Sequence, residues 1–428
     1  MKTSIRAGSG IYYQAIEDQP SFYTIGDAPF GLYYSSPTQV YLSEPFEDRR
    51  HDNDPGQRFP FTPPAPGALI NWATYLPIGG SPGVLPQNTT PYMIQYNLTI
   101  QRELPGSTLL TAGYVGTAGR HLLSQMESNP GITALCLEVA AKLPSGQGCG
   151  PGGEDQIYDL PSGGAVNGTR VHSVTSGRFL SQGLLDFTSN AYNGTFGMSE
   201  YNAFEASLQR HVGFGQFLAA YTWGKSIDDT SGPVDAVNPI NPRLSRSLSA
   251  FDMKQNFVVS YALQLPKLAS QPLYLRDSIG GWELSGITRF TTGIPVTISQ
   301  NVDQSLTGSG GIDTPDWNGQ PIAKFNPRST STGTYFSASQ FSLQPLGTFG
   351  SANRRFFLGP GLNDWDTALR KFLQIHERYS VEFRAEFFNV INHAQFGNPD
   401  GNQSDTSFGQ VSSARDPRIG QVALRFTF

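Results

Sequence analysis

The sequence predicts an all-β chain, and more narrowly an antiparallel transmembrane β-barrel, on three observations. Segments of about ten residues alternate apolar and polar side chains, as strands with one apolar face do. Short turns and long loops alternate between these segments, as they do in outer-membrane barrels. Only 15% of the 428 residues are charged. Even so, no run of about eighteen apolar residues exists, which excludes a transmembrane helix.

The composition also narrows the function classes. A soluble domain usually carries about 25% charged residues, so fewer positions than usual face bulk water here. The net charge is −5 and no Lys/Arg cluster stands out, so a nucleic-acid partner is not expected. The N-terminus has no apolar h-region of a secretory signal peptide. Either the protein is not exported, or its true beginning is missing.

The alternating segments account for about eleven strands. Turns at 105–107 and 213–215 join two pairs as hairpins, and connections at 266–280 and 375–378 join two more. If these short turns are periplasmic, the last strand runs inward, and counting back makes the first run inward as well. The predicted strands are 5–16 and 30–42, which are weaker, then 92–104, 108–122, 201–212, 216–228, 254–265, 281–298, 364–374, 379–391 and 419–428.

Long loops rich in Gly, Ser, Asn and Pro separate the hairpins. Unstructured loops beyond about fifteen residues are uncommon in compact domains, so several of them favour extracellular loops of a barrel. The whole chain, 1–428, then forms a single barrel domain. Single-chain bacterial barrels have even strand numbers, so an odd set indicates part of a barrel. The predicted loops lie at about 46–91, 123–195, 229–253, 300–363 and 392–418.

The last ten residues, Ile419 to Phe428, carry the clearest strand pattern. Alternation places Val422, Leu424, Phe426 and Phe428 on one face, and the chain ends on an aromatic residue. A terminal strand of this form resembles the signal that the barrel-assembly machinery reads. We therefore expect these four residues to act in assembly.

Two cysteines, Cys136 and Cys149, lie in a Gly/Pro-rich stretch of the second long loop. Their spacing matches no zinc-binding pattern. In an oxidising compartment they could form a disulfide, and two free thiols are the alternative that the sequence leaves open.

Two predictions concern the faces of the strands. Rings near strand ends indicate membrane interfaces, with ordinary β-propensity as the alternative: Tyr201, Tyr221, Trp223, Tyr261, Trp282, Phe290 and Phe388. Charged groups on the polar face either pair across strands or contact a plug: Glu205, Arg289, Arg370, Glu382, Arg384 and Glu386.

Other motifs do not support chemistry. Residues 79–83 fit the G-x-S-x-G pattern of a hydrolase nucleophile, but prolines surround them and no helical pattern follows. Residues 51–56 offer oxygen ligands, but Pro63 stands where an EF-hand needs Glu. We interpret this segment as a solvated acidic loop rather than a calcium site, and expect no metal, cofactor or catalytic residue. The same interpretation covers Asp228-Asp229, Asp313 and Asp316.

Five segments together resemble the Oar-like branch of TonB-dependent transporters. They are PYMIQYNLTIQREL, LLTAGYVGTAGRHL, YNAFEASLQR, AAYTWGKSIDD and FRAEFFNVINHAQFGNP. The resemblance covers about Ile5 to Phe428. Such transporters have about 22 strands around a plug, so this chain corresponds to the second half of the barrel.

The resemblance implies a function in the outer membrane of a Gram-negative-type bacterium. The barrel would contact lipid and take part in energised uptake of an unidentified ligand, without catalysis. The TonB complex would contact only the missing N-terminal part, which carries the signal peptide and the plug. Two alternatives are a structural or adhesive surface barrel without transport, and a secreted soluble β-sandwich protein.

Overall fold

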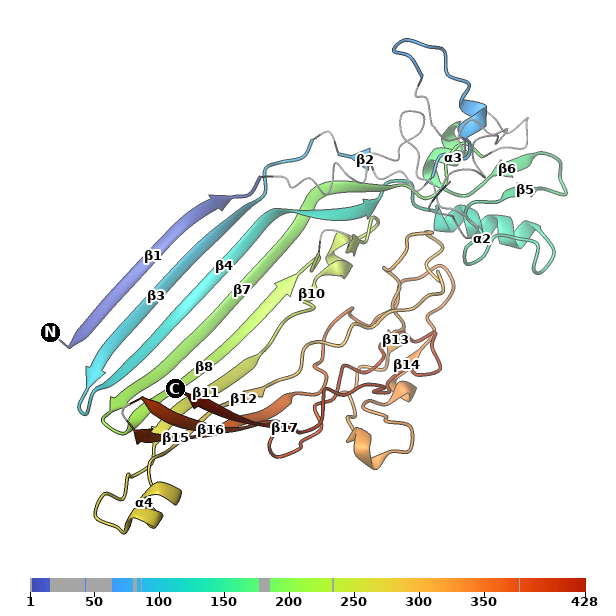
Figure 1. Ribbon diagram of the computed structural model, residues 1–428. Coiled ribbons are helices and arrows are strands. Elements are labelled where there is room, and N and C mark those ends of the chain that lie inside the picture. The colour runs from blue at the N-terminus through green and yellow to red at the C-terminus, as the bar shows by residue number, and fades with distance from the viewer. Residues whose placement is uncertain are drawn as a thin grey trace.

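A computed structural model of the chain describes residues 2–15, 43, 64–79, 83–85, 87–176, 185–232, 235–376 and 378–428. Its main feature is one antiparallel sheet in which ten long strands follow one another (Figure 1). These strands are β1 (Thr3–Tyr13), β3 (Tyr92–Leu104), β4 (Thr108–Glu127), β7 (Ala191–Val212), β8 (Gly215–Asp228), β11 (Gln255–Gln264), β12 (Trp282–Thr291), β15 (Leu362–His376), β16 (Tyr379–Phe388) and β17 (Ile419–Thr427).

The all-β antiparallel prediction is confirmed, and ten of the predicted strands correspond to these ten. The remaining predicted strand, 30–42, lies outside the described residues. β1 pairs directly with β3, with Ile5 opposite Ile100. Each strand is antiparallel to its neighbour, so β1 and β17 run in opposite directions. The prediction that the first strand runs inward is therefore wrong, because it counted 30–42 between these two strands.

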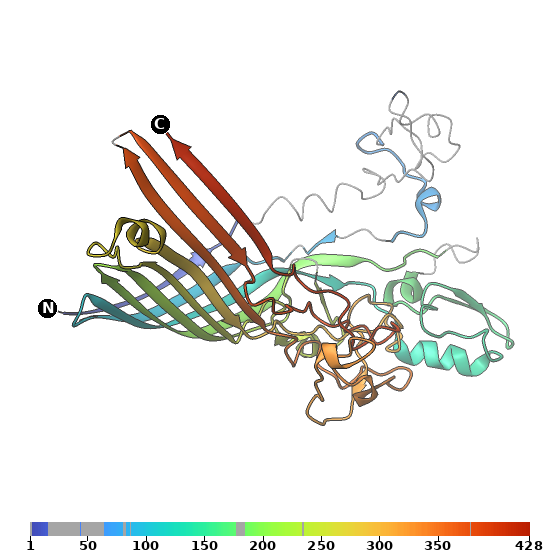
Figure 2. The same ribbon diagram turned by 60° about the horizontal axis from the view of Figure 1, so that its bottom comes forward.

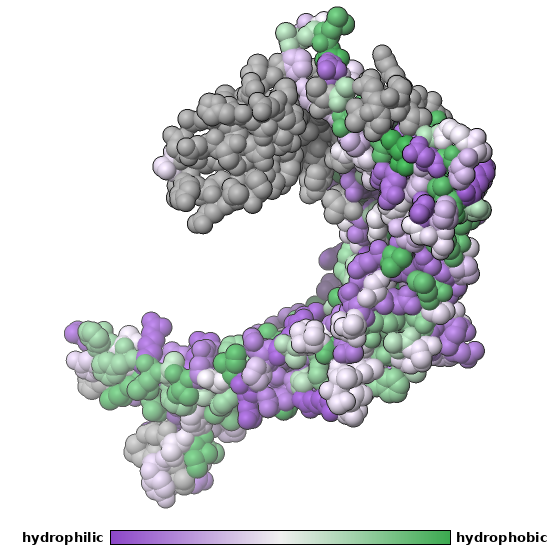
Figure 3. All heavy atoms as spheres, turned by 90° about the vertical axis from the view of Figure 1, so that its right-hand side faces the viewer, coloured by the Kyte–Doolittle hydropathy of each residue, from purple (hydrophilic) through white to green (hydrophobic). Residues whose placement is uncertain are grey.

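The sheet is curved but does not close on itself within the described residues. There, β1 pairs only with β3, and β17 only with β16. Seen from the loop end, these residues form an arc that is open on one side (Figure 3). The other two described sheets have two strands each, too few for the second layer of a β-sandwich over the large sheet. The described residues therefore do not form the β-sandwich of the second alternative.

Short turns lie at one end of the sheet and long connections at the other. Both ends of the chain and α4 (Leu273–Ser278) lie at the short-turn end (Figure 2). In the tight turn between β3 and β4, Gly106 has φ +75° and Ser107 has φ +54°, and glycine adopts this left-handed region without steric cost. Within the described residues, no helix is both long and apolar enough to cross a membrane.

The long connections carry more structure than the sequence predicted. β4 extends to Glu127 and β7 begins at Ala191, so the 123–195 loop is shorter than predicted at both ends. The short elements of the long connections are η2 (Trp72–Tyr75), β2 (Gly83–Val84), α2 (Thr133–Lys142), β5 (Ile157–Asp159), β6 (Ala165–Asn167), α3 (Val171–Ser176), β9 (Ala236–Val237), η4 (Pro242–Ser245), β10 (Ser247–Leu248), β13 (Asp316–Trp317), η5 (Pro327–Ser329), η6 (Ala338–Gln340) and β14 (Phe341–Ser342).

In the part of the chain that the structure describes, two hydrophobic cores lie in these connections rather than in the sheet. The larger core surrounds Phe336, whose ring packs edge-on against Phe341, Phe357 and Phe408. The smaller core, around the two cysteines, includes Val139, Tyr158 and Leu306. Apolar side chains of the long connections therefore fold against one another, as in a soluble domain.

Candidate functional site

The strand register separates the large sheet into an apolar face and a polar face. One row across six strands consists of Leu110, Leu208, Ala219, Val259, Thr288 and Trp365. The adjacent row, one residue along each strand, consists of Thr111, Ser207, Ala220, Val258, Arg289 and Asp364. Because side chains alternate between faces, the first row lies on the apolar face and the second on the polar face.

The polar face is the concave one. A cavity of about 530 Å³ is lined by residues of β7, β8, β11, β12, β15 and β16, and only the concave side of a curved sheet can bring side chains of six strands around one space. The lining includes Gln209, Ser260, Ser285 and Arg384 of the polar face. The apolar side chains therefore cover the convex, outer surface.

Aromatic rings lie near both ends of the outer face. Towards the loop end, Phe290 lies between Phe257 and Trp365, with ring centroids 6.3 Å and 5.8 Å away. Towards the short-turn end, the Trp282 ring is 5.9 Å from Phe383. Trp282 and Phe290 are about 26 Å apart along β12. This spacing is close to the apolar band of about 25 Å, flanked by aromatic girdles, in outer-membrane barrels.

Charged side chains on the concave face pair across strands, as one of the two sequence alternatives proposed. Arg370 Nη2 lies 2.7 Å from Glu283 Oε2, and Arg370 Nη1 lies 3.8 Å from Glu382 Oε1. Within β16, Glu386 pairs with Arg384, and it accepts a hydrogen bond across to β17 from the amide of Gln421. These contacts link β12, β15, β16 and β17 and give the inner surface a polar wall.

The four residues of the predicted assembly signal continue the outer face to its last strand. Val422, Leu424 and Phe426 lie opposite the apolar residues Ala385, Phe383 and Val381 of β16. The Phe426 ring stacks between Tyr379 and Phe428, at 6.2 Å and 6.1 Å. The outer edge of β17 is unpaired within the described residues, and the role of these residues in assembly stays a prediction.

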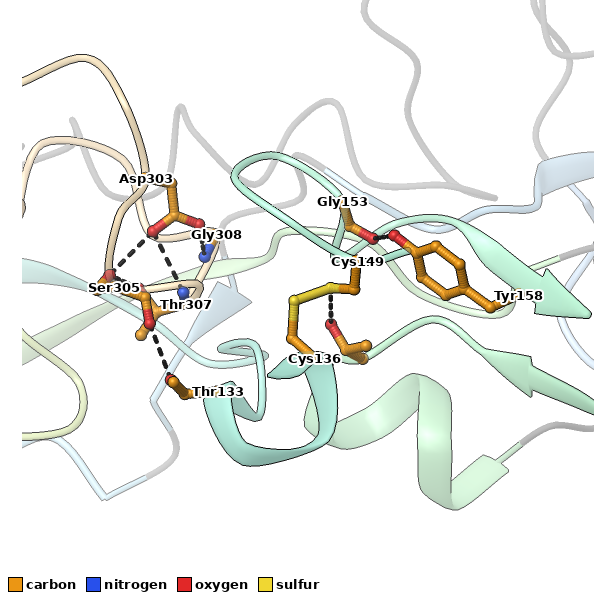
Figure 4. Close-up of a disulfide and its surroundings, with 10 residues drawn as sticks. Thr133, Cys136, Cys149, Gly153, Tyr158, Asp303, Ser305, Thr307 and Gly308 are labelled. Carbon is orange, nitrogen blue, oxygen red and sulfur yellow. Dashed lines mark hydrogen bonds between the residues drawn. A yellow bond between two sulfur atoms is a disulfide. The ribbon is translucent and has the colours of Figure 1, made fainter. Parts of the chain in front are cut away.

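The structure joins Cys136 and Cys149 as a disulfide, with the two Cα atoms 5.1 Å apart (Figure 4). The bond ties α2 to the segment that follows it. Both sulfurs are buried, and nearby the Tyr158 hydroxyl donates to the carbonyl of Gly153 at 2.6 Å. The disulfide is thus part of the smaller core.

A turn of the 300–363 connection docks onto this disulfide segment (Figure 4). Asp303 shapes the turn, because its carboxylate accepts the backbone N–H of Thr307 at 3.2 Å and of Gly308 at 2.7 Å. The Thr133 hydroxyl of α2 donates to the carbonyl of Ser305 at 2.9 Å. Between these contacts, Leu306 is fully buried in the smaller core. Two loops that are distant in sequence therefore form one unit.

Two buried carboxyl groups lie at this junction. Glu154 is 2% exposed and Asp313 is 4% exposed. Burial, together with the nearby Asp303 charge, raises the pKa of Glu154 and the pKa of Asp313 to about 7 each. The charge of Arg170 opposes the rise at Glu154, and its guanidinium also forms two hydrogen bonds with Asp155. The interpretation of Asp313 as a solvated loop acid is wrong, since the docked turn encloses it.

The acidic pair at the end of β8 is also buried rather than solvated. Asp228 is 1% exposed and Asp229 is 7% exposed. Asp228 accepts a hydrogen bond from Ser231 and lies within 4 Å of Arg354 and Arg355. Burial raises the pKa of Asp229. The solvated-loop interpretation is therefore wrong here as well, because Arg354 and Arg355, which lie beside Asp228, are more than a hundred residues further along the chain.

No metal-binding cluster is found among the described residues. Among them, no three His, Cys, Asp or Glu side chains are placed to hold a metal ion. The acidic loop at 51–56 lies outside the described residues, as do the three central residues of the G-x-S-x-G match. The candidate site is therefore the sheet itself, with an outer face, a polar inner wall and a folded loop end.

The comparisons with known proteins agree with this geometry. The model of a family described as "Outer membrane beta barrel domain" matches residues 1–421. The chain belongs to that family. It is therefore an outer-membrane protein, and its family is one of membrane barrels rather than enzymes. None of the curated proteins compared matches the sequence.

Solved outer-membrane structures also resemble this outer membrane beta barrel domain, at low identity. The outer membrane transporter YddB from Escherichia coli is 10% identical, with a TM-score of 0.41, and the match covers 81% of this chain and 34% of that one. The Escherichia coli K12 ferric-catecholate import receptor Fiu is 8% identical, with a TM-score of 0.36. That match covers 100% of this chain and 33% of Fiu. The ferripyoverdine receptor of the outer membrane of Pseudomonas aeruginosa is 12% identical, with a TM-score of 0.32. That match covers 79% of this chain and 27% of the receptor. The chain thus spans about a third of their length.

Several functional residues of this barrel domain escaped the sequence reading. Trp365 completes the aromatic row at the loop end, and strict alternation within its strand could have indicated it. Arg354 and Arg355 could not be found this way. Their partners lie more than a hundred residues away, and no local pattern links them.

Proposed function

We propose that this barrel domain is part of a TonB-dependent transporter of the Oar-like type, which imports a ligand that remains to be identified. The family match and the five sequence segments support this proposal. The observation that carries it is the polar concave face, where ion-paired side chains and a cavity of about 530 Å³ form an inner wall. A purely structural sheet has no need of such a wall, whereas a plug or a passing solute requires one.

The two open edges support a larger barrel. In lipid, each unpaired backbone group costs several kcal/mol, and within the described residues β1 and β17 each have an edge without a partner strand. We therefore propose that further strands complete the barrel in the membrane. An inner wall of this curvature would then surround a lumen large enough for a plug, as in transporters of about 22 strands.

Uptake can be tested by genetic epistasis in the native host. Strains that lack this gene, the TonB complex or both would be grown on a panel of scarce nutrients. The proposal predicts that growth on at least one nutrient is lost when either this gene or the TonB complex is deleted. The double deletion should reduce growth on that nutrient no further. A deletion that affects only surface attachment, with uptake intact on every nutrient, would favour the structural or adhesive alternative.

The assembly signal is a separate proposal with its own prediction. Phe428→Ala in the native protein should lower its outer-membrane level, because the terminal aromatic would no longer stack on Phe426 or be recognised by the assembly machinery. Thr427→Ala, on the polar face of β17, is the matched control and should assemble normally. Quantitative blotting of membrane fractions measures both, and equal levels for the two variants would contradict the signal.

A further inference from the structure

We propose that a pocket at the loop end of the outer face binds the phosphorylated headgroup of an outer-leaflet lipid. The pocket has a volume of about 780 Å³ and lies where β4, β7 and β8 leave the apolar band. It has an aromatic floor and a cationic upper wall. Its lining includes Tyr114, Phe204, Trp223, Lys225, Lys254 and Phe356.

The floor belongs to the lipid-facing surface. Tyr114, Phe204 and Trp223 lie opposite one another on three neighbouring strands, in a row parallel to the apolar row of Ala219. Trp223 is 54% exposed. Asn202 fixes the back of the floor, because its Oδ1 accepts hydrogen bonds from Tyr114 at 2.6 Å and from Tyr96 at 3.0 Å. A molecule seated here would rest on rings that continue downwards into the apolar band.

Two lysines lie directly above this floor. Lys225 lies two residues after Trp223, on the same face of β8. Lys254 lies beside this part of β8, because the backbone carbonyl of Lys254 accepts the Gly224 N–H at 3.0 Å. Both lysines are exposed. Neither ammonium group forms an ion pair or hydrogen bond with any residue that the structure describes. Two cations therefore face one pocket with their charge uncompensated by a direct partner.

The other charges around the pocket are already engaged. Arg246 pairs with Glu200 at 3.1 Å, and Arg355 pairs with Asp235 at 3.4 Å. Asp252, in the pocket wall, is 4% exposed and accepts the Ser226 N–H at 2.6 Å. Burial raises the pKa of Asp252, and the charges of Lys225 and Lys254 oppose that rise. The lysines thus remain the cations available to an incoming anion.

The position of the pocket identifies the occupant. A phosphate monoester carries about −1.5 to −2 charges and three acceptor oxygens, which two ammonium groups can satisfy. Free phosphate has no apolar part to contact the aromatic floor. A lipid headgroup carries acyl chains, which would lie along Phe204 and Trp223 on the outer face. Lysines near an anionic membrane surface add electrostatic attraction, so the two lysines favour a phosphorylated lipid over its dephosphorylated form.

The test uses the purified full protein and three probes. They are vesicles of phosphatidylcholine with lipid A, the same vesicles with dephosphorylated lipid A, and inorganic phosphate in solution. The variants are Lys225→Gln/Lys254→Gln, the charge-preserving Lys225→Arg/Lys254→Arg, and Lys267→Gln, an exposed lysine at the short-turn end, as the control. Binding would be followed by Trp fluorescence and by lipid that copurifies with the protein, quantified by mass spectrometry.

The proposal predicts that phosphorylated lipid A binds at least about tenfold more tightly than the dephosphorylated form. The Gln double variant should lose this preference, while the Arg double variant and the Lys267→Gln control keep it. Equal binding of both lipid forms, or a preference that survives the Gln double variant, would overturn the proposal. Displacement of the lipid by millimolar inorganic phosphate alone would assign the site to free phosphate and overturn the lipid assignment.

Discussion

The large sheet and the loop end solve the burial of apolar side chains in opposite ways. On the sheet, Leu424 is 73% exposed and Trp223 is 54% exposed, whereas Phe336 and Leu306 in the long connections are 0% exposed. Charged side chains follow the same order, because Arg370 of the sheet has 47% of its side chain exposed and Asp228 of the loop end is 1% exposed. Within the described residues, the loop end therefore buries its large apolar side chains inside the protein, and the sheet leaves them exposed.

The difference implies that the two regions depend on different solvents. The apolar outer face of the sheet gains its hydrophobic stabilisation from lipid, since nothing else in the described part of the chain covers it. The loop end has its own cores, a disulfide and buried ion pairs, as small extracellular domains do. Mutations in one region should therefore leave the other folded.

The largest expected effect is in the larger core. Phe336→Ala should destabilise the 300–363 connection by about 3–5 kcal/mol, because it removes a fully buried ring that contacts three others. Leu343→Ala, at a 54% exposed position of the same connection, is the control and should change little. Limited proteolysis on intact cells measures the loop, and heat-modifiable migration in gels measures the sheet. If Phe336→Ala lost both the protease resistance of the loop and the heat-modifiable migration of the sheet, the two regions would not fold independently.

A smaller loss is expected from removal of the disulfide. Cys136→Ser/Cys149→Ser should destabilise the 123–195 connection by about 2–4 kcal/mol, because the unfolded segment is no longer constrained. Protease cleavage between α2 and β7 should accelerate, and a reducing agent should have no further effect on the double variant. Unchanged cleavage would show that the docked turn around Leu306 holds the segment without the bond.

The pH dependence of the loop end is the smallest expected effect. Glu154 and Asp313 have folded-state pKa values near 7, above the ordinary values of acidic side chains. The contribution of these two groups to the stability of the docked turn is therefore fully present below about pH 4, and about 1–3 kcal/mol of it is lost as the pH rises through about 7, where both groups ionise. Hydrogen exchange of residues 303–308 measures this change. Glu154→Gln should flatten the profile, and an unchanged slope in that variant would sink the explanation.

The strands of the sheet could be predicted from the sequence because each one has a local alternation of apolar and polar residues. Val422, Leu424 and Phe426 alternate with polar neighbours, and such alternation is independent of partners. The direction of β1 could not be read, because it depends on whether 30–42 stands between β1 and β3, and pairing is a non-local property. The ends of β4 and β7 were missed since they run past the apolar band, where small and polar residues replace the alternation.

The loop end could not be predicted because its order comes from distant contacts. From its sequence neighbours, Asp228 is predicted to be a solvated loop acid, and only the structure shows Arg354 and Arg355 beside it. Leu306 sits in a Ser/Gly-rich stretch, and only the docking onto the disulfide segment shows that it is a core residue. The two cysteines were the single local signal, and the sequence left their bonding open.

The most direct test of the account uses two neighbouring alanines of β8. Ala219 lies in the apolar row and Ala220 in the polar row, so the two positions differ only in the face they occupy. Ala219→Arg should cost about 2–4 kcal/mol and lower the outer-membrane level strongly, because it places a charge in lipid, whereas Ala220→Arg should be tolerated on the inner wall. Equal levels for the two variants, or a greater loss for Ala220→Arg, would contradict a lipid-facing convex surface.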